Sequence, residues 1–300
     1  MSTRTVAEAQ PPAALDRGSK PSSLWRLRFT TAHIVGGIGV FLVISLVFTA
    51  VFASQLAPYD PTERVGIPFS PPSAEHWLGT NDIGQDILSE LIFGARISLL
   101  VGVTAGLITA VIGTTIGILS GYFPRVGSLL MRLTDVILVL PFLPLLIILA
   151  AYLGRSLFNT VIIIGVLVWA STARLIRSQV LVIAKQDYVL AARSLGARHQ
   201  HIIRQHVLPQ VMLLAVGEFV QITGQAILLE ASLAFLGLGD PLAKSWGTVL
   251  YWAQVRGAFL SPAWVWWVLP PGLLISFSTL GFALIGFALE QVLNPRLRQR

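Results

Sequence analysis

The stretch Leu190–Gln210, LAARSLGARHQHIIRQHVLPQ, is a polar interruption between two of the most apolar parts of the chain. It carries Arg193, Arg198 and Arg204 together with three histidines. The runs that flank it are long and poor in charge. The contrast between this segment and its surroundings decides which class of fold the chain adopts.

The composition is that of an integral membrane protein. Of the 300 residues, 54% are hydrophobic and 12% are charged, and the mean hydropathy is +0.75, which lies outside the range of an ordinary soluble domain. The chain has no cysteine, so it has neither a disulfide framework nor a thiolate metal site. Its formal charge of +7 is spread over loops between apolar runs, so no nucleic-acid partner is expected.

Six charge-poor runs are each long enough to cross a hydrocarbon core, which takes about 20 helical residues. The runs are continuous rather than alternating, which favours helices over a transmembrane barrel. The sequence therefore predicts an all-α integral membrane protein with six transmembrane helices, the first of them an uncleaved anchor. The runs are Ile34–Ala53, Ile97–Gly121, Val136–Leu153, Leu157–Ala173, Val211–Leu238 and Gly257–Leu289.

The lysines and arginines predict how these spans are oriented. Basic residues are concentrated before the first span, between the fourth and fifth, and after the sixth, and these three segments share one side of a six-span protein. Because cytoplasmic loops carry the excess of Lys and Arg, both termini and the segment 185–210 are expected in the cytoplasm. The loop Gln55–Phe93 has one arginine against six acidic residues, so it is expected to face outward.

The first half of the segment 185–210 has the periodicity of a short amphipathic helix. Its apolar positions fall at i, i+3, i+4 and i+7, and they are Tyr188, Ala191, Ala192 and Leu195. Gly196 follows where a left-handed residue commonly ends a helix. An exposed apolar stripe needs a partner that buries it, and the two alanines allow that partner to approach closely.

The second half predicts another short helix, with Ile202, Ile203 and Val207 on its apolar side. Pro209 is expected to break this helix just before the fifth span. Periodicity alone leaves two interpretations open. The segment is either a pair of helices that meet at a glycine elbow and dock on a protein, or an amphipathic element on anionic headgroups.

The spacing resembles the cytoplasmic loop of ATP-binding-cassette (ABC) importer permeases, which reads Glu-Ala-Ala, three residues, Gly, nine residues, Ile, any residue, Leu-Pro. The matching residues are Ala191, Ala192, Gly196, Leu208 and Pro209. Leu190 and His206 stand in place of the Glu and the Ile.

Four further stretches, in matching order and spacing, resemble the dipeptide/oligopeptide/nickel permeases of this class, in their second-permease branch. They are HWLGTNDIGQDILSELIFGARISLLVG (His76–Gly102), MRLTDVILVLP (Met131–Pro141), LLEASLAFLGLG (Leu228–Gly239) and NPRLR (Asn294–Arg298). The chain departs from the family at Gln85 and Glu90, where arginine is expected, and in GLGDPLAKSWG, which lacks part of a proline-rich loop.

The resemblance implies the type I ABC importer permease fold with a cytoplasmic coupling helix. It divides the chain into a disordered cytoplasmic tail, rich in Ala, Pro and Ser, a first transmembrane helix with its extracytoplasmic loop, a core permease domain that contains the coupling loop, and a cytoplasmic C-terminal tail. These units are residues 1–30, 31–93, 94–290 with the loop 185–210, and 291–300.

In such importers the permease performs no catalysis. The resemblance implies a second homologous permease subunit, two ATPase subunits that hold ATP and Mg²⁺, an extracytoplasmic substrate-binding protein, and the lipid of the cytoplasmic membrane. None of Lys20, Lys185 and Lys244 lies in a Gly-x-x-x-x-Gly-Lys-Ser/Thr loop. We therefore expect no catalytic residue, cofactor or metal on this chain.

The resemblance also implies two contact sites. The coupling helix is expected to sit in a groove of the ATPase subunit and to turn closure of that subunit into rotation of spans four and five. The expected coupling residues are Asp187, Tyr188, Ala191, Ala192, Arg193, Leu195, Gly196, Leu208 and Pro209. Those expected to dock the binding protein are Asp82, Gln85, Asp86 and Trp246.

Three acids, Asp135, Glu218 and Glu230, lie inside or at the edge of the spans, where an ionisable group is costly and faces a polar interior. They are either ligands for the amine of a peptide or structural hydrogen-bond acceptors. We favour the structural interpretation for Asp135, one turn from Arg132, and for Glu230, and leave both open for Glu218.

The alternative function is an ion-coupled secondary transporter that uses the three acids as proton sites. Such carriers often have two repeated halves, and no similarity is visible between residues 1–150 and 151–300. The sequence therefore favours half of the pathway of an importer for di- or oligopeptides or a related small solute.

Overall fold

The computed structural model describes residues 24–293, with side chains from 33 to 291. Within that range the regular elements are helices, apart from one isolated bridge between Thr80 and Asp86. The expected terminal tails lie outside the described residues, except that 24–30 belong to the first helix and 291–293 to the last.

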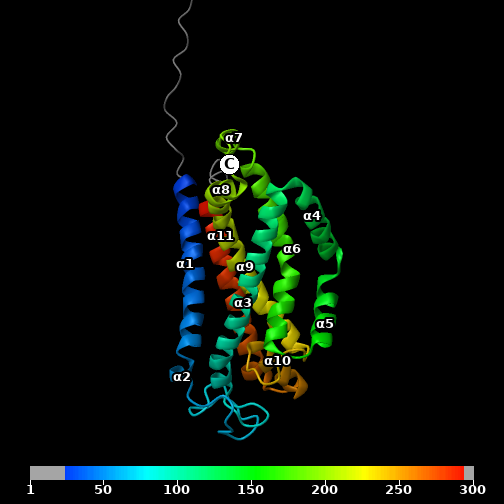
Figure 1. The fold of residues 1–300 in the computed structure, drawn as a ribbon. Coiled ribbons are helices and arrows are strands. Elements are labelled where there is room, and N and C mark those ends of the chain that lie inside the picture. The colour runs from blue at the N-terminus through cyan, green and yellow to red at the C-terminus, as the bar shows by residue number, and fades with distance from the viewer. Residues whose placement is uncertain (1–23, 294–300) are drawn as a thin grey trace, which may run out of the picture.

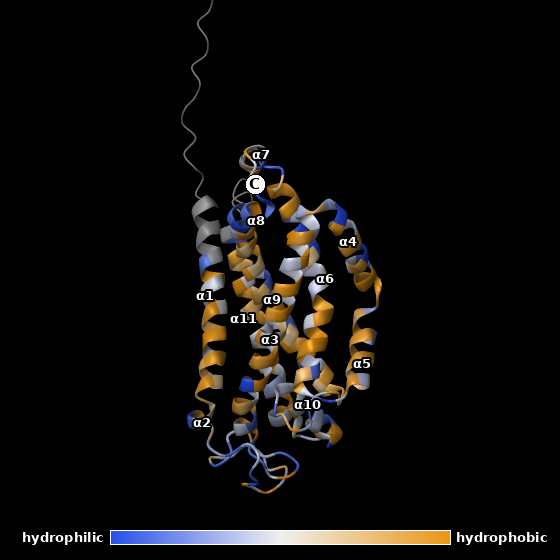
Figure 2. Cartoon of the chain, in the orientation of Figure 1, coloured by the Kyte–Doolittle hydropathy of each residue, from blue (hydrophilic) through white to orange (hydrophobic). Residues whose placement is uncertain are grey.

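Long helices run side by side and form the body of the protein (Figure 1). They are α1 (Leu24–Val51), α3 (Ile87–Tyr122), α6 (Leu157–Ile183), α9 (Leu208–Phe235) and α11 (Leu269–Leu293). The shorter helices are α2 (Ala53–Leu56), α4 (Pro124–Val139), α5 (Phe142–Leu153), α7 (Asp187–Ser194), α8 (His199–Ile202) and α10 (Trp246–Val255). Figure 2 shows hydrophobic residues along the long helices and hydrophilic ones at α8 and in the loop before α3.

Five described helices are long and apolar enough to cross a membrane, and there are six spans if α4 and α5 count as one. This agrees with the predicted all-α membrane fold. The α4–α5 pair is bent by 89° at Leu140 and Pro141. Leu140 is extended (ψ 140°) because the proline ring disfavours a helical residue before it.

The fourth predicted span, the shortest in the sequence, is a helix of 27 residues. Its last turns carry Arg174 and Arg177, so the charge-poor run ends well before the helix does. The sixth predicted span is shorter than expected, because the candidate crossing helix begins at Trp264 rather than Gly257. Gly257 has φ +74° and is followed by a short 3-10 helix, Ala258–Leu260, which the apolar pattern did not separate from the span.

Pro209 does not break a helix, contrary to the sequence prediction. His199–Phe235 is one helix of 37 residues, in which Ile203–Val207 form a π-helix directly before α9. A proline in an α-helix clashes with the carbonyl four residues earlier, and the wider π turn displaces that carbonyl. A second π-helix, Trp264–Val268, stands in the same place before the Pro270-Pro271 pair of α11.

The helix α3 packs along α6 and α9, and glycines determine how close α6 lies. Three glycines, spaced four residues apart on α3, face three side chains with the same spacing on α6. Gly113 faces Thr172, Gly117 faces Ile176 and Gly121 faces Val180. A Cβ atom at any of the three would lie 2.6–2.7 Å from the facing Cβ, closer than real atoms approach. Small residues at this spacing let two membrane helices bring their backbones together.

We expect Gly117→Leu to destabilise the fold, because the leucine has no space against Ile176 and overpacking costs about 1–3 kcal/mol. The matched control is Gly217→Leu in α9, where a Cβ atom has nothing within 4 Å. Thermal unfolding in detergent should show a lower midpoint for the first variant only. Equal midpoints would show that the α3–α6 distance is not set by glycine.

Candidate functional site

The helix α7 projects beyond the ends of the long helices, next to α8 (Figure 1). It ends in a left-handed Gly196 with φ +79°, as predicted from the sequence. The Gly196 N–H donates to the carbonyl of Arg193, and the Ala197 N–H donates to that of Ala192, each at 3.0 Å. This pair of bonds is the Schellman motif, and it fixes the direction in which the chain leaves α7.

One side of the elbow is anchored in the body of the protein. Val189, Ile202 and Val207 are fully buried and pack in one apolar cluster with side chains near the ends of α3 and α6 and the start of α9. Those side chains include Ile118, Tyr122, Ile176, Val180 and Val211. The prediction for Ile202 and Val207 is confirmed. Val189 was missed because it lies outside the predicted stripe and nothing in the periodicity marks it.

Polar contacts add to this anchoring. The Tyr122 hydroxyl lies 3.0 Å from Nδ1 of His199, and Gln210 Nε2 donates to the Tyr188 hydroxyl at 2.6 Å. The guanidinium of Arg193 lies 5.5 Å above the Tyr122 ring, a cation–π contact. Arg193 therefore has a partner within its own chain.

The other side of the elbow faces solvent. Tyr188 and Ala191 are exposed, Ala192 is half-buried, and Leu195 has 89% of its surface exposed. Asp187 is exposed in the first turn of α7. Leu208, half-buried, and Pro209, exposed, begin α9. The predicted stripe is thus an apolar surface on a firmly held helix.

The three acids near the spans have protein partners. Asp135 pairs with Arg174 of α6 at 2.6 Å, so its expected pairing with Arg132 is wrong. The i+3 spacing was compatible with Arg132, but α6 brings another arginine closer. Glu218, half-buried on α9, accepts a hydrogen bond from Thr172 at 3.3 Å.

Glu230 is buried on α9 and accepts a hydrogen bond from Ser98 of α3 at 3.5 Å. The Ser98 hydroxyl in turn accepts from the backbone N–H of Trp246 at 3.2 Å. That N–H belongs to the first turn of α10, where a negative charge is favoured. The arrangement ties three helices together, in line with a structural role for Glu230.

Most of the residues expected to dock a binding protein are buried. Gln85, Asp86 and Trp246 are at most 6% exposed. Asp86 caps α3 by accepting from the Ser89 N–H, and the Trp246 indole donates to the Leu91 carbonyl at 3.0 Å. Asp82 pairs with Arg256 at 2.8 Å. These contacts hold together the loops at the α3–α10 end of the protein. Docking of a binding protein at this end stays a prediction, in which exposed residues near these buried ones make the contact.

The two family departures lie together. Lys244, in the loop before α10, donates to Gln85 Oε1 at 2.7 Å and forms an ion pair with Glu90. Asn81 Nδ2 also donates to Glu90, at 3.2 Å. At two positions where the resemblance leads us to expect arginine, this chain has two acceptors and supplies the cation from the loop before α10. Lys244 is far from Glu90 in the sequence, and only the fold brings the two side chains together.

Comparisons with known proteins agree on one class. Residues 113–299 match the family described as the binding-protein-dependent transport system inner membrane component. The di/tripeptide transport system permease protein DppC of Pseudomonas aeruginosa is 40% identical over 93% of this chain and 94% of its own. The oligopeptide transport system permease protein OppC of Bacillus subtilis is 33% identical over 96% and 97%.

The fold is also similar to that of a solved ABC importer. A chain of the MetNI methionine ABC transporter, in an inward-facing conformation, aligns with a TM-score of 0.54 and 18% identity. The alignment covers 71% of this chain and 98% of that one. The likeness shows the type I permease fold expected from the sequence.

We expect Lys244→Met to destabilise the protein, because it leaves the buried Glu90 carboxylate without its cation, a loss of about 3–5 kcal/mol. The double variant Glu90→Gln/Lys244→Met should recover most of that loss, because a glutamine can still accept from Asn81. Midpoints of thermal unfolding, measured side by side, test this. A double variant no more stable than the single one would contradict the ion pair's role.

Proposed function

Because the chain belongs to the family of binding-protein-dependent transport system inner membrane components, we propose that it forms half of the pathway of an ABC importer for di- or oligopeptides. In this proposal the chain couples to ATPase subunits through α7 and the elbow at Gly196. The single observation that carries the coupling role is an apolar stripe, exposed to solvent, on a helix that Val189 anchors in an apolar cluster with side chains of α3, α6 and α9.

The peptide substrate is inferred from relatives whose names state dipeptide, tripeptide or oligopeptide transport. The partners proposed are a second permease, two ATPases that carry ATP and Mg²⁺, and a binding protein on the side of the loop before α3. The chain itself has no catalytic role and needs no cofactor in this scheme. The excess of arginine in the segment 185–210 supports a cytoplasmic location for the α7 end.

The rival scheme of an ion-coupled secondary transporter loses its support. Membership in a binding-protein-dependent family places the chain in another class of transporter. Asp135 has an ion-pair partner, and Glu230 lies in a closed network with Ser98. Glu218 has one hydrogen bond to Thr172 and is the acid with most capacity left for a substrate ammonium group.

The coupling role predicts that Gly196→Val strongly lowers transport. A β-branched residue at φ +79° adds strain of about 1–3 kcal/mol and changes the angle of α7. Dipeptide uptake should fall about tenfold or more in proteoliposomes that contain the co-expressed transporter. The matched control is Gly154→Val, because Gly154 also has positive φ (+90°) and open space but lies after α5, away from α7.

Ala192→Asp tests the stripe itself, because it places a charge in the contact with the ATPase, and Ser194→Asp is its control on an exposed position outside the stripe. Ala192→Asp should lose ATPase subunits on purification, while the control retains them. Normal uptake and ATPase retention in Gly196→Val and Ala192→Asp would refute the coupling role and favour an element that rests on lipid.

A further inference from the structure

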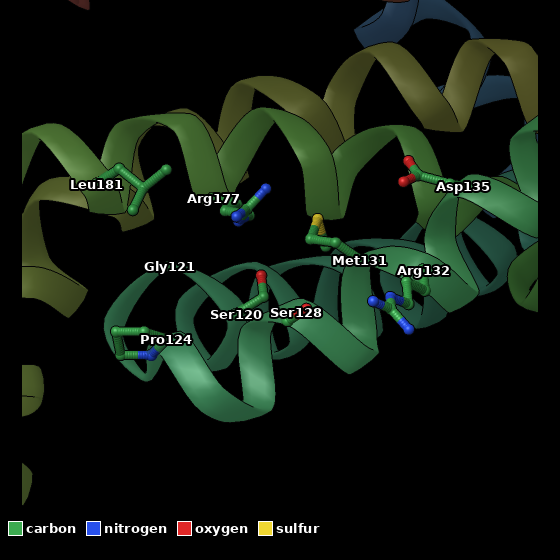
Figure 3. A pocket seen from close by; sticks show the side chains of 9 residues that line it. All are labelled: Ser120, Gly121, Pro124, Ser128, Met131, Arg132, Asp135, Arg177 and Leu181. Atoms are coloured by element: carbon green, nitrogen blue, oxygen red, sulfur yellow. The ribbon is translucent and has the colours of Figure 1, made fainter.

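A pocket of about 370 Å³ lies between α4 and α6, beside the end of α3 (Figure 3). Its wall combines two cations with hydroxyl groups. Arg132 and Ser128 come from α4, Arg177 from α6 and Ser120 from α3. None of the contacts described above for the elbow, the outer loops or the buried acids uses Arg132 or Arg177.

Arg177 is the unusual member of this wall. Its Nε atom is buried and has no hydrogen-bond partner within the described part of the chain. Arg177 as a whole is half-buried, but a buried polar atom normally has a hydrogen-bond partner. The Nε–H group therefore remains available to an acceptor that the described residues do not supply.

The nearby acid does not neutralise the pocket. Asp135 also lines it, but its carboxylate pairs with Arg174. The ion pairs found among residues 33–291 include neither Arg132 nor Arg177. Two positive groups on different helices thus line one small space, and an anion bound there would be attracted to both.

The surface around the pocket indicates which anion fits. On α4, Arg132 is the pocket residue next to an apolar strip. The strip consists of Leu129, Leu133 and Val136, which are 71%, 52% and 60% exposed. Leu181 extends the apolar surface onto α6. A soluble anion makes no use of such a strip, whereas acyl chains do. Basic pockets between membrane helices near the cytoplasmic boundary are suited to lipid headgroups.

We propose that this pocket binds the phosphate group of an anionic phospholipid, held between Arg132 and Arg177, with the acyl chains along the strip on α4. The lipid joins α4 to α6 at the basic end of the bundle. It thereby steadies the first half of the bent α4–α5 pair. The assignment depends on the membrane fold and not on any ATPase or binding protein.

The test uses the full chain purified in a non-ionic detergent and stripped of lipid. Phosphatidylglycerol is added at increasing concentration, with phosphatidylcholine and sodium phosphate as the other arms. Binding is measured by native mass spectrometry and by the rise in unfolding temperature. Wild-type protein should bind phosphatidylglycerol and gain stability, and phosphatidylcholine should have little effect.

Arg132→Gln and Arg177→Gln should each weaken phosphatidylglycerol binding by about tenfold or more, as expected for loss of a charged hydrogen bond. Arg125→Gln is the matched control, since it removes the same charge from α4 outside the pocket and should keep binding within about twofold. If Arg177→Gln folds poorly, the exposed Arg132 decides the question alone.

Two results would overturn the proposal. The first is equal phosphatidylglycerol binding by Arg132→Gln and Arg125→Gln, which would leave only a general attraction between a basic protein and an acidic lipid. The second is stabilisation by sodium phosphate as strong as that by phosphatidylglycerol and lost in the same variants, which would assign the pocket to a soluble anion.

Discussion

The close approach of α3 and α6 is the constraint on which the rest of the structure depends. Gly113, Gly117 and Gly121 leave no Cβ atom between the two backbones, so the helices lie in one fixed register. The last of these glycines directly precedes Tyr122 in α3. Tyr122 anchors the elbow through His199 and Arg193. The position of α7 therefore follows from the packing of α3 on α6.

The same helix organises the opposite end of the bundle. Asp86 caps α3, and Glu90 in its first turn binds Lys244 from the loop before α10. Two turns further on, Ser98 connects Glu230 of α9 to the first turn of α10. One rigid element thus joins the proposed ATPase end to the outer end, where the binding protein is proposed to act. A movement imposed on α7 would reach both α6 and α9 through a shared apolar cluster.

The sequence was most informative where one local rule decides the outcome. Continuous apolar runs predicted the membrane helices, and the position of Gly196 after an amphipathic stripe predicted its left-handed conformation, which needs no tertiary contact. The buried side chains Ile202 and Val207 followed from periodicity for the same reason. The spacing of Gly113, Gly117 and Gly121 led to no prediction, because the sequence does not show that α6 packs against this side of α3.

Other features depend on distant parts of the chain or on geometry that residue type does not reveal. Pro209 looks like a helix breaker until a π turn accommodates it. Arg132 is the nearest cation to Asp135 in sequence, whereas folding brings Arg174 to it. Gln85, Asp86 and Trp246 look like loop residues free to dock, and only the fold shows them buried. Ala258 and Ala263, buried in the segment just before the last span, resemble part of that span because burial within protein and burial in lipid select the same side chains.

The central claim is that α7 moves together with the ends of α3 and α6 as one body. The chain contains no cysteine, so spin labels can be attached at two introduced cysteines, Leu190→Cys on α7 and Gln179→Cys on α6, both at exposed positions outside the proposed contact stripe. Electron–electron double resonance on the assembled transporter would compare the distance between the labels without nucleotide and with ATP trapped. The account predicts one narrow distance distribution that nucleotide does not shift. A shift, or a second distance that appears with ATP, would show that the elbow flexes and would contradict a rigid coupling element.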